Sequence, residues 1–198
     1  MTTPSPPERP RLLSDAAMVV LGAVALMWAI ELVDSIVLSD RLQGGGIHPR
    51  RADGIDGILW APLLHGGIGH LIGNTVPFLV LGGLVSLHGS AMFARVTATI
   101  VVLGGALTWV LARGGNHIGA SGVVFGFLGF LVAAAIVRRN LRSIALGVVA
   151  VALYGGLVFG LLPSPGVSWE GHLFGGLAGV VAAAVFAQKP IPSNEVLT

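Results

Sequence analysis

The sequence predicts an all-α fold in which six helices each cross a membrane. Of the 198 residues, 54% are hydrophobic and only 10% are charged, a balance that soluble domains rarely have. The apolar residues gather in six segments, each near the roughly 17–25 residues that a spanning helix needs. These segments cover about residues 16–38, 66–87, 92–112, 119–137, 143–162 and 171–187. The chain is therefore expected to be a polytopic membrane protein.

The rest of the composition excludes several classes. Glycine accounts for 30 residues without a Gly-X-Y repeat, which excludes collagen and fits closely packed membrane helices. Cysteine is absent, so the chain has no disulfide framework, thiol nucleophile or thiolate metal site. The net charge is +2 and no basic block occurs, so no nucleic-acid partner is expected.

The two ends of the chain read as short cytoplasmic tails around one membrane domain. Residues 1–15 are polar and rich in proline, which predicts a disordered tail. The apolar run that follows is too long for a signal peptide and lacks a clear cleavage site. Residues 188–198 form the second predicted tail, which leaves residues 16–187 as the membrane domain. Short tails without a signal peptide fit the cytoplasmic membrane of a bacterium.

The first segment is the least regular, because it carries Glu31 and Asp34 in its second half. One interpretation places both carboxylates at the end of the span, beside the polar loop that follows. The other gives them a role in an ion pathway, as carboxylates inside membranes often have. The loop itself, about residues 39–64, is rich in glycine and charge.

The later breaks are short polar stretches, HGS, ARGGN, RRNLR and PSPG, and their arginines predict an orientation. With the N-terminus inside, the cytoplasmic side holds Arg9, Arg11, Arg95, Arg138, Arg139, Arg142 and Lys189. The other side holds Arg41, Arg50, Arg51 and Arg113. Because cytoplasmic loops carry the excess of Lys and Arg, we expect both termini to be cytoplasmic.

Chemically active side chains lie where the second, fourth and sixth segments begin. His65, His70 and Asn74 open the second segment, Ser121 the fourth and His172 the sixth. Even-numbered spans run in the same direction, so these side chains share one side of the membrane. With the N-terminus inside, that side is extracytoplasmic.

Glycine spacing predicts that the fourth and sixth helices approach closely. Gly122-xxx-Gly126 and Gly175-xxx-Gly179 are both close-packing motifs. If these faces meet, Ser121 and His172 come within hydrogen-bond reach, and a serine hydroxyl needs such a base to become a nucleophile.

The same end of the bundle offers donors for a developing oxyanion. His70 and Asn74 lie four residues apart, on one helix face, and each carries an N–H group. The backbone N–H of Ser121 adds a donor at a helix N-terminus. No carboxylate is an obvious third member, since Glu31 and Asp34 are candidates only by default. We therefore expect a Ser–His dyad in which packing orients His172.

These residues together resemble the rhomboid family of intramembrane serine proteases. Residues 119–122, GASG, match the family's GxSG nucleophile motif. His172 with Gly175 and Gly179 matches the HxxGxxxG of its base helix, and residues 65–74 match HxxxxHxxxN. The resemblance covers about residues 16–187 and implies a rhomboid-like six-helix bundle.

The resemblance also implies roles and partners. Ser121 is the nucleophile, His172 the base and then the acid, and His70 with Asn74 holds the oxyanion. The substrates are transmembrane proteins, cut within the lipid bilayer near the extracytoplasmic end of a helix, without a metal or cofactor. Two details depart from the family. Residues 39–64 do not obviously carry the Trp-Arg pair of some members, and Phe125 stands where many members have tyrosine.

Other interpretations stay open or are excluded by specific features. A catalytically inactive rhomboid-like protein that binds transmembrane clients is the main alternative, although such proteins have normally lost the serine or histidine. A small transporter would show repeats or midplane charges. A metalloprotease would need a motif such as HExxH, and a soluble hydrolase GxSxG, and the chain has neither. His65 fits capping or a loop contact as well as chemistry. His48, His88 and His117 are expected in loops or at interfaces.

Overall fold

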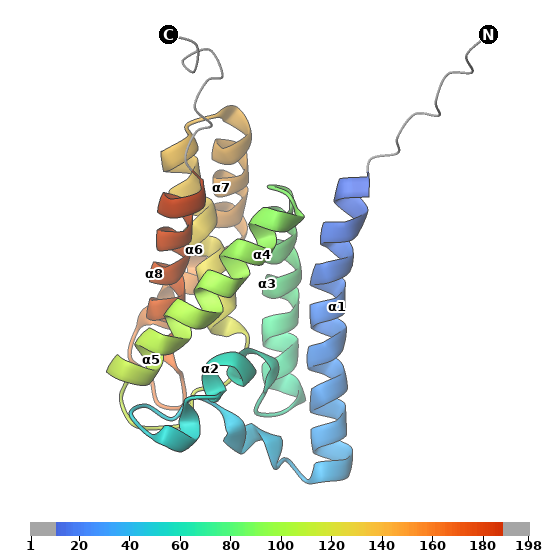
Figure 1. The fold of residues 1–198 in the computed structure, drawn as a ribbon, viewed down its shortest axis with the longest axis vertical. Coiled ribbons are helices and arrows are strands. Elements are labelled where there is room, and N and C mark those ends of the chain that lie inside the picture. The colour runs from blue at the N-terminus through green and yellow to red at the C-terminus, as the bar shows by residue number, and fades with distance from the viewer. Residues whose placement is uncertain (1–10, 188–198) are drawn as a thin grey trace, which may run out of the picture.

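The computed structural model describes residues 11–187, and within them the protein is a bundle of helices (Figure 1). Six of these helices are long and apolar enough to cross a membrane. They are Ala17–Leu38, Ile68–Ser86, Ser90–Leu111, Ser121–Arg138, Leu141–Leu161 and Trp169–Phe186. The predicted fold class and the six spans are thus confirmed, with ends that shift by at most two residues. The division into tails and membrane domain stays a prediction, since residues 1–10 and 188–198 lie outside the described part.

Several spans are built from more than one type of helix. The first combines α1 (Arg11–Val33) with the π-helical turn η1 (Asp34–Leu38). The loop after it holds η2 (Leu42–Gly45), η3 (Ala52–Gly54), α2 (Gly57–Trp60) and η4 (Ala61–Leu63). The next spans are α3 (Ile68–Ser86), then α4 (Ser90–Thr99) continued by η5 (Ile100–Gly104) and α5 (Gly105–Leu111). The last three are α6 (Ser121–Arg138), α7 (Leu141–Tyr154) with the 3-10 helix η6 (Gly155–Leu161), and α8 (Trp169–Phe186).

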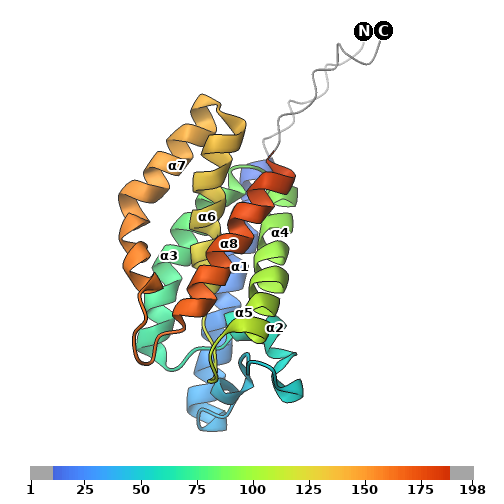
Figure 2. The ribbon, with the colours of Figure 1, turned by 90° about the vertical axis from the view of Figure 1, so that its left-hand side faces the viewer.

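Helix α6 lies at the centre of the bundle, packed against α3, α7 and α8 (Figure 2). Its apolar residues fill the core, where Phe127 and Phe130 are fully buried. Large apolar side chains also cover the outside of the bundle, and Ile36 and Val148 are examples. Such a surface suits contact with lipid tails, because apolar groups in a bilayer have no water to avoid. The chain is a multi-pass membrane protein.

Helix α1 packs along α3, and polar groups fix it to α3 and to the first loop. The Trp28 indole N–H donates to the Thr75 hydroxyl at 3.0 Å. Near the end of the span, Glu31 and Asp34 are buried, 1% and 2% exposed. Asp34 accepts from the backbone N–H of Leu42, in the first loop. The two carboxylates therefore lie near the end of the span, where Asp34 bonds to the polar loop and Glu31 accepts from the Ser35 hydroxyl, as one of the two interpretations expected.

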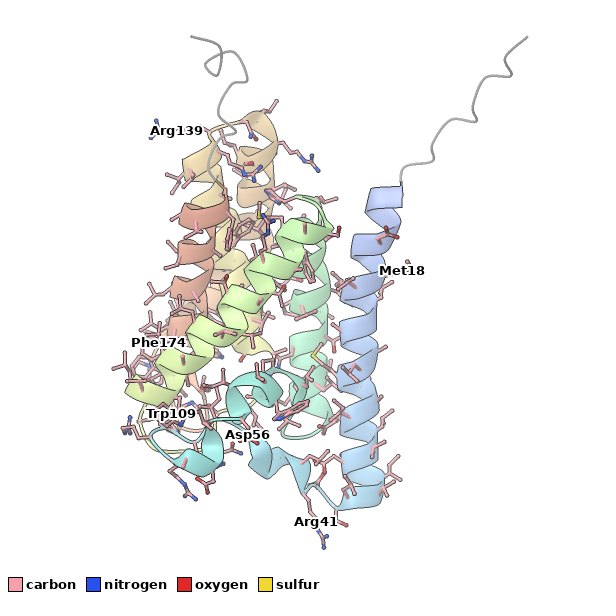
Figure 3. The ribbon with its side chains drawn as sticks, in the orientation of Figure 1. Met18, Arg41, Asp56, Trp109, Arg139 and Phe174 are labelled. Atoms are coloured by element: carbon pink, nitrogen blue, oxygen red, sulfur yellow. The ribbon has the colours of Figure 1, made fainter. Side chains whose placement is uncertain are left out.

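The N-terminal ends of α3, α6 and α8 lie at the same end of the bundle, beside the first loop (Figure 1). Figure 3 labels Arg41 at this end and Arg139 at the opposite end. The loop is fixed to the bundle by polar contacts, since the Trp109 indole N–H donates to the Arg51 carbonyl at 2.9 Å. The helix starts that carry the predicted site therefore share one end, as their even-numbered order requires.

Candidate active site

Ser121 and His172 form a hydrogen-bonded pair between α6 and α8. The Ser121 Oγ lies 2.8 Å from the His172 Nε2. Ser121 is the first residue of α6, and Gly119 just before it has a φ of +108°, which a side chain would strain. His172 lies in the first turn of α8 and is 9% exposed. The structure thus places the predicted nucleophile and base within direct hydrogen-bond distance.

Interlocking glycines let α6 and α8 approach closely enough to form this pair. A Cβ atom on Gly175 would overlap the carbonyl oxygen of Gly122. One on Gly179 would overlap the carbonyl of Gly126 in the same way, one turn further along. The backbone of α6 therefore fills the space that side chains would take on α8. The predicted meeting of the two glycine faces is confirmed.

The His172 ring is held from two sides. It stacks on Phe125 with ring centroids 4.3 Å apart and planes 5° apart. Its Nδ1 lies 2.8 Å from the carbonyl oxygen of Gly160, in η6. The stacking on Phe125 matches the expectation that packing orients the base. The Gly160 contact was not predicted, because a backbone carbonyl has no signature in the sequence.

No carboxylate takes part in these contacts among the described residues. Glu31 accepts from the Ser35 hydroxyl and Asp34 from Leu42, so neither bonds to His172. Glu170, two residues before the base, pairs instead with Arg113 at 3.4 Å. The geometry is that of a Ser–His pair with a backbone carbonyl on the far side of the imidazole.

His70 and Asn74 lie on α3 and line the same cavity as Ser121 and His172. This cavity has a volume of about 990 Å³. The His70 Nδ1 accepts from the backbone N–H of Gly66 at 3.1 Å, which leaves the hydrogen on Nε2. That side of the ring lies against Gly119, where a Cβ atom would come within 2.7 Å of Nε2. His70 therefore presents an N–H beside the turn that carries Ser121.

Asn74 offers a second side-chain donor at this position. Its Nδ2 donates one hydrogen to the His70 carbonyl at 2.9 Å. A side-chain amide has two N–H groups, so one remains for another acceptor. A smaller cavity of about 50 Å³ reaches Ser121 and His172 from the side of Thr108. All four predicted site residues therefore meet around one open space.

His65 supports the turn before Ser121. It is 1% exposed, and its Nε2 accepts from the backbone N–H of Ala120 at 3.4 Å. Burial, and then the neighbouring charge of His70, lower the pKa of His65 to about 4. A neutral imidazole is what an acceptor at Nε2 requires. Of the two interpretations of His65, this geometry matches the loop contact.

Two loops that flank the cavity are tied together by residues that sequence reasoning did not assign to the site. The His117 Nδ1 lies 2.5 Å from the Ser168 Oγ. The Arg113 guanidinium donates to the Val167 carbonyl at 2.6 Å. Below them, the backbone N–H groups of Ile47 and His117 each bond to the other residue's carbonyl at 3.0 Å. In the sequence, Arg113 and His117 stand in a glycine-rich loop, but this pattern does not indicate which residues they contact.

Comparisons with known proteins agree with this architecture. A family model described as the rhomboid domain matches residues 55–189. An uncharacterized protein of Mycobacterium tuberculosis is 43% identical over 186 residues, which cover 89% of this chain and 77% of the relative. An uncharacterized protein of Mycobacterium leprae is 40% identical over 175 residues, 83% of this chain and 68% of the relative.

A more distant relative carries a functional name. The rhomboid protease GluP of Bacillus subtilis is 32% identical over 125 residues, which cover 62% of this chain and 24% of GluP. The matched family model spans more than half of the chain and includes the helices that carry Ser121, His172, His70 and Asn74. On these matches and on its six membrane helices, the chain belongs to the rhomboid family.

Proposed function

We propose that this protein is an intramembrane serine endopeptidase that uses Ser121 and His172 as a catalytic dyad. The observation that carries the proposal is the 2.8 Å hydrogen bond between the Ser121 Oγ and the His172 Nε2 beside an open cavity. A serine hydroxyl becomes a nucleophile when an adjacent base can take its proton. The name of the Bacillus subtilis relative, a rhomboid protease, supports the same activity.

The reaction has two balanced halves. The His172 Nε2 accepts the hydroxyl proton while the Ser121 Oγ attacks the scissile carbonyl carbon and forms a tetrahedral intermediate. That intermediate collapses, the C–N bond breaks, and His172 returns its proton to the leaving amine, which leaves an ester on Ser121. Water then gives a proton to His172 and attacks the ester. The second collapse breaks the ester C–O bond and releases the carboxyl product, while His172 returns its proton to the Ser121 Oγ.

The negative oxygen of each intermediate would be held by three N–H groups. These are the backbone N–H of Ser121, the His70 Nε2–H and the free N–H of the Asn74 amide. Preorganised donors of this kind stabilise charge that develops only in the transition state. The first residue of α6 also lies at the positive end of the helix dipole, which favours an anion there.

The substrates would be transmembrane helices of other proteins. The cavity is lined by α3, α6, η6 and α8, whose outer faces carry apolar side chains, so a substrate segment would reach it from the bilayer. A helix hides its carbonyl groups in hydrogen bonds, so the segment must unwind locally before it is attacked. A polar cavity enclosed by protein can hold the water that the second half consumes. The mycobacterial relatives support a bacterial membrane as the location.

The test is cleavage of a single-span substrate by the purified protein in liposomes. We expect the wild type to cleave, and Ser121→Ala and His172→Ala to lose cleavage while they stay folded. Ser90→Ala and His48→Ala are matched controls, because Ser90 also begins a helix and the His48 ring bonds to the Gly44 carbonyl in a loop. Both controls should cleave like the wild type.

A different result would favour the second candidate, a rhomboid-like protein that binds transmembrane clients without cutting them. A folded wild type that cleaves none of several substrates, yet retains a co-reconstituted single-span client as firmly as Ser121→Ala does, would contradict the protease.

A further inference from the structure

The 3-10 end of the fifth span touches the base directly. The Gly160 carbonyl in η6 lies 2.8 Å from the His172 Nδ1, on the side of the ring opposite Ser121. A neutral imidazole carries one hydrogen, and a carbonyl oxygen can only accept. The Nδ1 of His172 therefore donates to Gly160, and its Nε2 is left as an acceptor for the Ser121 hydroxyl.

This arrangement does for His172 what a carboxylate does in a three-residue catalytic triad. There, the carboxylate holds the imidazole in the tautomer and orientation in which Nε2 can accept the proton. Here the hydrogen bonds of the His172 ring within the described residues go to Ser121 and Gly160. The acceptor is a backbone group, so its position depends on where η6 lies.

Gly160 fits this position because it has no side chain. A Cβ atom there would come within 2.9 Å of the Phe125 Cζ and 3.3 Å of the His172 Nδ1. Both distances are shorter than ordinary van der Waals contact, so the added methyl would disturb the stacked pair of rings. Gly156 lies in the same 3-10 helix, and a Cβ atom there would meet nothing within 4 Å.

The segment that carries Gly160 is weakly held by the rest of the bundle. Its neighbours Val158 and Phe159 are 55% and 72% exposed. The fifth span is the least enclosed of the six, since 11% of its most apolar 18-residue stretch is buried, compared with 44% in the fourth span. Elements with few buried contacts are displaced at the lowest cost.

We propose that Gly160 is a positioning residue whose carbonyl selects the tautomer of His172, so that the base is competent only while η6 lies against α8. This inference rests on the proposed protease function and deepens it. When η6 moves away, Nδ1 loses its acceptor and the hydrogen can move to Nε2, where it opposes proton transfer from Ser121. When η6 closes against α8, His172 therefore becomes able to accept the Ser121 proton.

The first test reads the tautomer without any activity. ¹⁵N NMR of histidine-labelled protein distinguishes Nδ1–H from Nε2–H, and the His172 signal is assigned by its loss in His172→Ala. We expect the Nδ1–H form in the wild type and in the matched control Gly156→Ala. Gly160→Ala should shift His172 toward Nε2–H or a mixture. An Nε2–H form in the wild type, or the same spectrum in Gly160→Ala and Gly156→Ala, would overturn the proposal.

The second test separates this inference from the protease function. Gly160→Ala should lower kcat about 10- to 100-fold, the range for a catalytic group displaced by about 1 Å, with KM changed less than about twofold. Gly156→Ala should cleave like the wild type. Equal kcat in the two variants, with an active wild type, would refute the positioning role and leave the protease intact. An inactive wild type would refute the protease function, and the NMR measurement of the His172 tautomer would still test the role of Gly160.

A third variant covers the case in which Gly160→Ala fails to fold. Replacing the Gly160–Leu161 amide by an ester, through ligation of a synthetic C-terminal segment, weakens the carbonyl as an acceptor without adding a side chain. It should shift the tautomer in the same direction and lower kcat with KM preserved. An unchanged tautomer in the ester would contradict the proposal.

Discussion

At the scale of single residues, Asn74 has one free N–H beside the turn that carries Ser121. If it donates to the oxyanion, Asn74→Ala should lower kcat about 10²- to 10³-fold, the usual cost of one oxyanion donor, and leave KM nearly unchanged. Steady-state cleavage kinetics in liposomes measure both. Thr75→Ala is a matched control, because Thr75 lies next to Asn74 but bonds to Leu71 and Trp28. A rise in KM with kcat unchanged would place Asn74 in substrate binding instead.

The pKa of His65 predicts how stability depends on pH. Burial lowers this pKa from 6.5 to about 4, so the unfolded chain binds the proton more tightly than the folded protein does. With respect to His65, the free energy of unfolding is therefore at its full value above about pH 6.5, and it falls as the pH drops toward 4. The slope for one group cannot exceed about 1.4 kcal/mol per pH unit.

The measurement is the unfolding midpoint in mixed detergent between pH 4 and 7, for the wild type and His65→Gln. The variant should lose part of the decline, because glutamine does not titrate. His88, whose pKa burial also lowers, titrates in both proteins and cancels in the difference. Parallel curves for the two proteins would show that His65 does not contribute.

At the scale of elements, the contact between α6 and α8 depends on glycines that interlock with backbone carbonyls. Gly175→Ala places a methyl against the Gly122 carbonyl and should destabilise the fold by about 1–3 kcal/mol, the usual cost of overpacking. It should also reduce cleavage, since Gly175 lies one turn from His172. Gly83→Ala on α3 is the matched control, because its methyl would meet nothing within 4 Å. If both variants unfold at the same denaturant concentration, these glycines do not set how closely α6 and α8 approach.

The sequence predicted the elements that have a simple physical signature. Length and apolar composition were enough for the six spans, because a bilayer imposes both. The glycine spacing indicated the contact between α6 and α8, because small residues on one helix face let another helix approach closely. The first loop was beyond prediction in detail, since its short helices depend on contacts such as those of Asp34 with Leu42 and Trp109 with Arg51.

The residues of the site also differ in whether the sequence could indicate them. That Ser121, His172, His70 and Asn74 meet at one end of the bundle was predictable, because their positions at the starts of even-numbered spans place them at one depth; their catalytic roles stay a prediction. The Gly160 carbonyl was not, because every residue has a carbonyl and only the fold decides which one reaches His172. Phe125 was singled out only by the family resemblance, and its stacking on His172 is seen in the structure.

At the scale of the whole molecule, the distribution of arginines predicts that both termini are cytoplasmic and the site is extracytoplasmic. The chain has no cysteine, so single cysteines can report on each end. Ile55→Cys lies in the first loop and Leu141→Cys beside the arginines of residues 138–142, and both positions are exposed. In intact bacterial cells, a membrane-impermeant maleimide should label Ile55→Cys, and Leu141→Cys only after lysis. The opposite pattern would invert the orientation.

If His172 activates Ser121, then Ser121 should react with a fluorophosphonate probe. The probe is attacked by an activated serine, and mass spectrometry of the digested protein locates the adduct. We predict one adduct, on Ser121, that forms in the wild type and in Ser90→Ala and is lost in His172→Ala. A folded wild type without an adduct on Ser121, or equal labelling of Ser121 in His172→Ala, would contradict the dyad.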